Sequence, residues 1–291
     1  MIHNVLESPA DPWLQEDLER LAQCGLPFEA FDGKAILVTG ATGLVGSQTV
    51  RALAAINRLR RTNIQILAMI RNLRKAQQIF GDLLQRGDIY PVVADLNGEI
   101  SIPSPVDYII HCAAVTASKT MVTKPVETIV TAIRGTRSIL ELAREKHVTA
   151  FCYLSSMEVY GQWDGSREVT EDVMGYVDPL VIRSNYPMSK RMCENLCACY
   201  QSEYGVGIRI ARLAQTFGAG VLPGETRVFA QFAQSVLSGQ DIVLHTRGLS
   251  EGNYCYTADT IRALFTILLK GENGQLPRTR ARGHPSAWRA A

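Results

Sequence analysis

An apolar strand followed at once by a glycine-rich turn is the feature that most constrains the fold of this chain. Residues 36–46 read Ile-Leu-Val-Thr-Gly-Ala-Thr-Gly-Leu-Val-Gly, with glycines at Gly40, Gly43 and Gly46. Glycine permits a tight turn and a close backbone approach, and the free N–H groups of a following helix attract phosphate. The order strand, glycines, helix therefore favours a dinucleotide-binding unit over a turn with no ligand.

Apolar strands and helices alternate along most of the chain. Strands that are apolar on both faces and are separated by helices form a parallel sheet covered on both sides. The predicted fold class is therefore α/β, a doubly wound parallel sheet of the Rossmann type. We expect strands at residues 35–38, 64–70, 89–93, 106–111, 150–154 and 207–210, and helices at residues 47–57, 73–84, 125–146 and 187–204.

The chain divides into four predicted segments. Residues 1–33 form an N-terminal helical extension, and residues 34–215 form the NAD(P)-binding domain. Residues 216–274 form a smaller substrate-binding lobe, interleaved with the main domain, with helices at 226–238 and 259–270 and a strand at 241–245. Residues 275–291 carry four arginines and no periodic apolar pattern, so a disordered tail is expected. A reading frame interrupted near Gly274 would explain this change and leave the lobe truncated.

Composition excludes several classes of protein. The net charge is +2 and the basic residues are scattered, which argues against a nucleic-acid partner. No apolar stretch approaches the ~20 residues that span a bilayer, and the N-terminus lacks the pattern of a signal peptide. Seven cysteines indicate reduced thiols, and Cys193, Cys197 and Cys199 share one helix without a histidine, so no metal site is expected. These features predict a cytoplasmic protein that binds a small molecule.

Residues after the second, third and fourth strands fall where a nucleotide cofactor needs contacts. Asp95, followed by Leu96, would accept a hydrogen bond from the adenine amino group, and Ala113 and Ala114 let a cofactor lie against the backbone. Arg71 stands where NAD-binding folds carry an acidic residue, and a guanidinium pairs well with a 2′-phosphate. Arg71 thus favours NADP over NAD, although a solvated loop cation is the alternative.

Tyr186 and Lys190 form the strongest candidate pair for catalysis. They stand four residues apart at a predicted helix start, so both side chains project to the same side. An ammonium beside a phenol lowers the tyrosine pKa from about 10 and makes it a usable acid or base. Ser156 and Glu158 follow the fifth strand, at the edge where such sheets bind ligands. Ser156 would hold a substrate oxygen, while Glu158 acts as a second base or merely bonds to loop backbone.

Together these motifs resemble the extended short-chain dehydrogenase/reductases, and within them the NAD-dependent epimerase/dehydratase group that acts on nucleotide-linked sugars. The resemblance spans roughly residues 34–274 and implies Ser156, Tyr186 and Lys190 as the catalytic set, with Glu158 as an auxiliary base. It also implies transient oxidation of the sugar by hydride transfer and a homodimer that pairs the helices at 125–146 and 187–204. The segments that carry it are 39–46, 111–114, 155–161, 186–190, 212–213 and 256–259. The expected cofactor-binding residues are Gly40, Thr42, Gly43, Leu44, Val45, Gly46, Arg71, Asp95, Leu96, Ala113, Ala114, Tyr186 and Lys190.

Departures from the family pattern leave the reaction open. Met157 stands where the 4,6-dehydratases carry an aspartate, and a thioether cannot protonate a leaving hydroxyl. Ala132 replaces a frequent relay asparagine, and Gly252 lies near the position of a phosphate-binding arginine. The first hypothesis is an epimerase/dehydratase-type enzyme. The alternatives are a UDP-glucuronate-decarboxylase-like enzyme and a non-catalytic NAD(P)-binding or inactive truncated relative.

Overall fold

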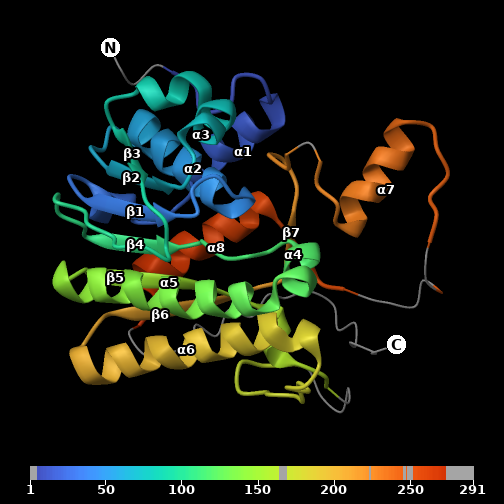
Figure 1. Cartoon of the computed structure of the whole chain (residues 1–291). Helices are drawn as coiled ribbons and strands as arrows, with labels where there is room; N and C mark the ends of the chain where they lie inside the picture. The colour runs from blue at the N-terminus through green and yellow to red at the C-terminus, as the bar shows by residue number, and fades with distance from the viewer. Residues whose placement is uncertain (1–4, 164–168, 223, 245–246, 248–251, 273–291) are drawn as a thin grey trace.

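A six-stranded parallel sheet forms the centre of the molecule, in the order β3-β2-β1-β4-β5-β6 (Figure 1). The computed structural model describes residues 5–163, 169–222, 224–244, 247 and 252–272. The reversal of strand order between β1 and β4 is the switch point at which doubly wound sheets bind ligands. The predicted Rossmann-type class is confirmed. The strands are β1 (Ala35–Thr39), β2 (Gln65–Ile70), β3 (Ile89–Val93), β4 (Tyr108–His111), β5 (Ala150–Ser156) and β6 (Ile208–Leu213).

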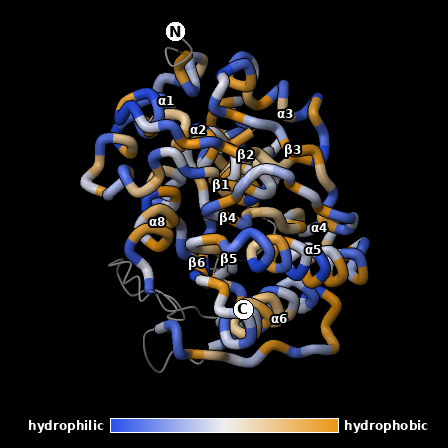
Figure 2. The backbone as a smooth tube through the Cα atoms, turned by 90° about the vertical axis from the view of Figure 1, so that its left-hand side faces the viewer, coloured by the Kyte–Doolittle hydropathy of each residue, from blue (hydrophilic) through white to orange (hydrophobic). Residues whose placement is uncertain are grey.

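Helices cover both faces of this sheet. α8 and α5 lie on opposite sides of it (Figure 2). The helices of one face are α1 (Pro12–Ala22), α2 (Leu44–Arg60), α3 (Leu73–Phe80) and α8 (Thr257–Lys270), and those of the other are α5 (Pro125–Glu145) and α6 (Asn185–Tyr204). Shorter elements are η2 (Phe28–Phe31), η3 (Gly81–Gln85), α4 (Ser118–Thr123), η4 (Met157–Tyr160), η5 (Ile182–Ser184), β7 (Gln215–Phe217), α7 (Val228–Leu237) and β8 (Tyr254–Tyr256).

Alternation along β1 divides the apolar interior into two layers. Ile36 and Val38 belong to the cluster that packs on α2 and α8, while Ala35 and Leu37 belong to the cluster under α5 and α6. Successive side chains of a strand point to opposite faces, so an all-apolar strand must be covered on both sides. This explains why the four apolar residues of β1, 35–38, are all buried.

Two predicted elements differ from the observed ones. The helix expected at 73–84 ends at Phe80, because Gly81 has a φ of +52° and turns the chain into η3. The strand expected at 241–245 is not formed at residues 241–244, and residue 245 lies outside the described residues. Instead, β7 and β8 form a small two-stranded parallel sheet.

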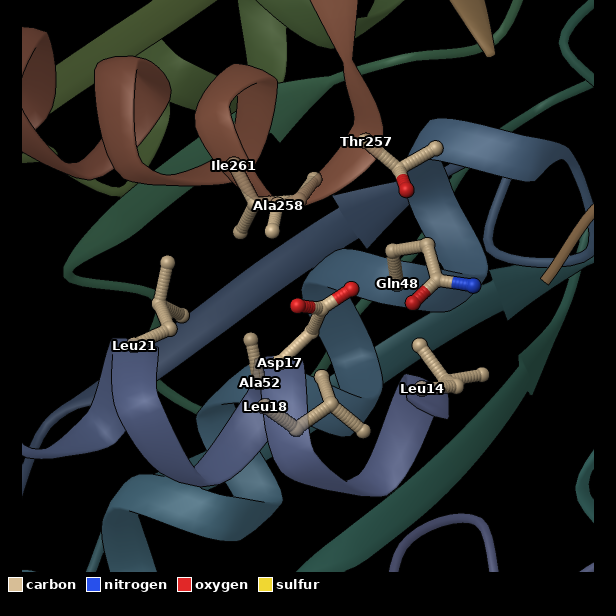
Figure 3. A pocket seen from close by; sticks show the side chains of 9 residues that line it. All are labelled: Leu14, Asp17, Leu18, Leu21, Gln48, Ala52, Thr257, Ala258 and Ile261. Atoms are coloured by element: carbon tan, nitrogen blue, oxygen red, sulfur yellow. The ribbon is translucent and has the colours of Figure 1, made fainter. Parts of the chain in front are cut away.

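The N-terminal extension is built into the main domain. Its helix is confirmed as α1, and Phe28 and Phe31 of η2 are buried against Phe265 of α8. α1, α2 and α8 surround a small hollow in which Asp17, Gln48 and Thr257 are the polar side chains (Figure 3). None of the predicted site residues lines this hollow. The predicted boundary at residue 215 between a main domain and a lobe stays a prediction. α8, which follows that boundary in the sequence, packs in the core of the main domain.

Candidate active site

The glycine-rich turn brings β1 to the start of α2 at the switch point. Gly40 has a φ of +63°, and a Cβ there would lie 2.8 Å from Ala113 Cα. A Cβ on Gly46 would lie 2.3 Å from the Gly40 carbonyl oxygen, so α2 can approach the turn only with glycine at this position. Both residues are therefore required by the packing of the turn itself.

Gly43 differs from Gly40 and Gly46 in its surroundings. It is exposed and is the N-cap of α2, with no side chain capping the helix. The first N–H groups of α2, which include those of Leu44 and Val45, therefore have no side-chain acceptor, and the helix dipole makes this end positive. Thr42 is half-buried beside them. This donor set fits the pyrophosphate of a dinucleotide.

A buried histidine orders the neighbouring end of β4. Thr39 Oγ1 lies 2.8 Å from His111 Nδ1 and accepts a hydrogen bond from the Ala113 N–H at 3.2 Å. His111 Nε2 lies 3.4 Å from Thr136 Oγ1. Burial, with a smaller contribution from the charge of Lys190, lowers the pKa of His111 to about 3. The imidazole is therefore neutral, and this bridge between β1 and β4 fixes Ala113 beside the glycine turn.

The other predicted cofactor contacts follow the neighbouring strands. Arg71 is exposed just after β2. Asp95 is exposed after β3, and its Oδ1 accepts a hydrogen bond from the Asn97 N–H at 2.9 Å. Leu96 is partly buried against Gly135 of α5, and Ala114 is partly buried after β4. All of them lie at the carboxyl edge of the sheet, and their contact with a cofactor stays a prediction.

Ser156 and Glu158 lie at the carboxyl end of β5. Ser156 caps η4, because its Oγ accepts the Glu158 N–H at 3.2 Å. In the described ranges the Glu158 carboxylate accepts no hydrogen bond from loop backbone, the role that one alternative gave it. Its Oε1 instead accepts a hydrogen bond from Arg183 Nη2 at 3.0 Å.

Tyr186 and Lys190 project from the first turns of α6 toward this strand end. Lys190 is buried, and its Nζ donates a hydrogen bond to the Leu154 carbonyl at 2.6 Å. The same Nζ lies 4.8 Å from the centre of the Tyr153 ring and 5.8 Å from that of the Tyr186 ring. Burial lowers the pKa of Lys190 to about 8. The predicted proximity of the pair is confirmed.

The expected lowering of the tyrosine pKa by this ammonium is wrong for this structure. Burial raises the pKa of Tyr186, and the Glu158 carboxylate raises it further. A hydrogen bond with Ser156 and the charge of Arg183 lower it, but they do not offset the burial. The Lys190 charge is directed instead at the Leu154 carbonyl. Tyr186 is therefore a protonated phenol near Ser156.

Arg183 is the residue of this cluster that the sequence analysis did not single out. Its guanidinium carbon lies 5.7 Å from the centre of the Tyr186 ring. The sequence signal that could have found it is a cation three residues before the tyrosine. In the folded chain η5 brings this cation beside Glu158.

Within the described residues, no group of three His, Cys, Asp or Glu side chains is arranged for a metal ion. All seven cysteines are free thiols. Among the helices of the described ranges, none is both long and apolar enough to cross a bilayer.

The strand order and the uncapped glycine turn define the Rossmann class of dinucleotide-binding folds, and comparisons with known proteins name the family. The model of the NAD dependent epimerase/dehydratase family matches residues 36–280. The chain belongs to this family. The match begins at β1, so the N-terminal extension precedes it.

Curated relatives include UDP-glucuronic acid decarboxylases of plants and animals. Decarboxylase 6 of Arabidopsis thaliana is 29% identical over 83% of this chain and 68% of its own length. Decarboxylase 1 of Danio rerio is 28% identical over 81% of this chain and 54% of its own length. The chain thus spans about half to two thirds of these relatives.

Solved structures agree on the fold. The dTDP-glucose 4,6-dehydratase DesIV of Streptomyces venezuelae, with NAD and TYD bound, has a TM-score of 0.70 at 24% identity, over 83% of this chain and 74% of that one. The UDP-glucuronic acid 4-epimerase of Bacillus cereus, with UDP-glucuronic acid and NAD, has a TM-score of 0.67 at 23% identity, over 82% and 74%.

Proposed function

We propose that this protein is an NAD-dependent enzyme that modifies a nucleotide-linked sugar by transient oxidation of a sugar hydroxyl. The observation that carries the proposal is the meeting of Ser156, Tyr186 and Lys190 at the carboxyl edge of the sheet, on the side of the glycine turn. The names of the relatives support the substrate class, since they are decarboxylases of UDP-glucuronic acid and dehydratases of dTDP-glucose.

The uncapped start of α2 would hold the pyrophosphate, with Gly43 leaving room for it. Ala113 and Ala114 would flank the cofactor, and Asp95 and Leu96 would receive the adenine. When bound, the cofactor accepts a hydride and returns it. We infer NAD, because the related structures are solved with NAD and lend no support to the NADP preference expected from Arg71.

Each of the four side chains would have its own role in the reaction of the sugar. Ser156 lies near the phenol of Tyr186, close enough to influence its pKa, and would hold the substrate oxygen beside it. Tyr186 would first release its own phenol proton to solvent, and the phenolate would then receive the hydroxyl proton and later return it to the sugar. The Lys190 ammonium, 5.8 Å from the ring centre, would stabilise the phenolate while the proton is absent. Glu158 lies close enough to affect the tyrosine and would serve as a second base for a proton on a neighbouring carbon.

Among the family reactions, decarboxylation and epimerisation fit better than dehydration. Dehydration needs a group that protonates a leaving hydroxyl, and Met157, next to Ser156, has no proton to give. Epimerisation at the hydroxyl carbon requires only oxidation and reduction at the hydroxyl that Tyr186 serves. Decarboxylation adds loss of carbon dioxide and return of a proton to the carbon that bore the carboxylate, but no leaving hydroxyl. Oxidation next to the carbon that bears a carboxylate gives a β-keto acid, which loses carbon dioxide readily.

A homodimer through α5 and α6 completes the proposal. These helices lie side by side on the outside of the sheet (Figure 1). Apolar side chains are exposed on them: Val126 is 72% exposed, Met192 52%, and Ile129 and Met188 nearly 40% each. Such an apolar face favours association with a second copy. Sedimentation analysis is expected to give a dimer, and Val126→Glu with Met192→Glu is expected to give monomers.

Product analysis tests the enzymatic proposal. The protein is incubated with NAD and, separately, with UDP-glucuronate, UDP-glucose and dTDP-glucose, and the products are examined by mass spectrometry and chromatography. Loss of carbon dioxide, loss of water, or an isomer of unchanged mass identifies the reaction. Tyr186→Phe is expected to lower turnover at least about a hundredfold. Tyr90→Phe, which changes a half-exposed tyrosine of β3, is the matched control. Equal turnover by the two variants would refute the assignment.

A further inference from the structure

Arg183 is a cation that solvent can reach at the edge of the Tyr186 ring. Its side chain is 38% exposed, and that of its partner Glu158 is 35% exposed. Its guanidinium carbon lies 5.7 Å from the ring centre. Any molecule whose hydroxyl meets the Tyr186 phenol therefore has a guanidinium within reach of its neighbouring substituents.

Most hydrogen-bonding capacity of this guanidinium is unused by the protein. A guanidinium has five N–H donors, and within the described part of the chain Arg183 makes a single hydrogen bond, from Nη2 to Glu158 Oε1. Two nearby arginines are different. Arg212 is 5% exposed and holds the Glu194 carboxylate with two nitrogens, and Arg191 donates to the Val159 and Gly175 carbonyls. Arg183 is thus the arginine of this region that retains donors for a ligand.

The chemistry of the reacting hydroxyl suggests the partner. In a hexuronic acid the carboxylate stands on the carbon next to the one that bears the 4-hydroxyl, so its oxygens lie only a few bonds from that hydroxyl. A guanidinium binds a carboxylate with two parallel hydrogen bonds, and such charge-assisted bonds are among the strongest in proteins. A neutral hydroxymethyl group in the same place offers no charge.

We propose that Arg183 binds the carboxylate of an acidic nucleotide sugar and that Glu158 occupies this binding position until the sugar arrives. This assignment rests on the proposed function and narrows its substrate to a uronic acid. The two carboxylates compete for one guanidinium, so binding of the acidic sugar releases Glu158 from its ion pair beside Tyr186. A neutral sugar cannot displace Glu158 in this way.

Binding measurements test the assignment without requiring turnover. Calorimetric titration of the NAD-saturated protein with UDP-glucuronate and UDP-glucose is expected to show tighter binding of the acidic sugar by about tenfold or more. Arg183→Gln is expected to abolish this preference while the affinity for UDP-glucose stays within about twofold. Arg20→Gln, which removes an exposed arginine that also has a single carboxylate partner, is the control and is expected to change neither affinity.

Glu158→Gln provides a readout that a purely structural role for the ion pair would not give. Removing the competing carboxylate is expected to tighten UDP-glucuronate binding, with no gain for UDP-glucose, and the gain is expected to vanish when Arg183→Gln is also present. Equal affinity of the wild type for both sugars, or an equal loss of both in Arg183→Gln, would overturn the assignment and leave the proposed function intact. Absence of binding by either sugar would overturn both.

Discussion

Lys190 Nζ and the carbonyl oxygen of Leu154 are 2.6 Å apart, and this bond fixes the α6 lysine to the end of β5. The ammonium is therefore held by backbone rather than by the phenol of Tyr186. It reaches the tyrosine only through space, with 5.8 Å to the ring centre. The lysine is thus positioned by the sheet before any ligand binds, and its burial has a measurable consequence for stability.

The free energy of unfolding is expected to rise with pH because of Lys190. Its pKa is about 8 in the folded protein and 10.5 in the unfolded chain, so between these values the unfolded state binds the extra proton. Relative to Lys190→Met, the wild type should gain about 2–3 kcal/mol between roughly pH 7 and pH 10. Urea unfolding of both proteins at each pH measures the difference. A constant difference would show that Lys190 titrates normally.

His111 is expected to make the free energy of unfolding depend on pH at the acidic end of the range. Its pKa is about 3 in the folded protein and 6.5 in the unfolded chain, so its contribution to stability is present above pH 6.5 and is lost as the pH falls toward 3. Between roughly pH 7 and pH 5 the wild type should lose about 2 kcal/mol more than His111→Gln. Parallel unfolding curves for the two proteins at both pH values would contradict a neutral buried imidazole.

The glycine turn provides a test that separates folding from binding. Gly46→Ala places a methyl group 2.3 Å from the Gly40 carbonyl oxygen and is expected to cost about 2 kcal/mol or more of stability. Gly43→Ala is expected to cost about 1 kcal/mol at most, because the residue is exposed and its φ of −83° suits alanine. Its methyl group should nevertheless weaken NAD binding about tenfold, since it stands where phosphate approaches the helix. Unchanged NAD affinity in Gly43→Ala would place the pyrophosphate elsewhere.

Arg71 tests the choice of cofactor. Its exposed guanidinium after β2 can pair with a 2′-phosphate but has no comparable partner on NAD. Arg71→Ala is therefore expected to weaken NADP binding about tenfold and NAD binding less than twofold. Lys75→Ala, an exposed cation in the first turn of α3, is the control. Equal effects of both variants on NADP would mean that Arg71 is only a solvated surface cation.

How well the sequence predicted each feature depended on how far apart along the chain the interacting residues lie. The strand-and-glycine pattern gave the sheet and the turn, because local spacing determines both. The short strands β7 and β8 were missed, since three residues carry no usable periodicity. The Tyr186 pKa was predicted in the wrong direction, because it depends on burial and on Glu158, which lies on a different element. Spacing along a helix does not reveal either effect.

The N-terminal extension shows the same limit for charged residues. Its sequence predicted a helical extension, and α1 is the helix of that extension. Nothing local indicated that Glu7, just before it, would be fully buried. That result depends on Arg58 and Arg86, which lie 51 and 79 residues further along the chain. Long-range ion pairs of this kind are visible only in the folded structure.

The buried carboxylate of Glu7 is expected to be essential for the stability of the whole chain. Arg58 Nη2 lies 2.8 Å from Glu7 Oε2, Arg86 Nη1 lies 2.9 Å from Glu7 Oε1, and Arg86 also binds Asp88. Glu7→Ala leaves the Arg86 side chain, which is 0% exposed, with one carboxylate fewer and should cost about 3–5 kcal/mol. Glu16→Ala, which breaks the exposed pair with Arg20, should cost less than about 1 kcal/mol. Urea unfolding of the two variants measures both effects. Similar stabilities would show that the extension is dispensable to the fold, whereas the expected gap would make it part of the domain that begins at β1.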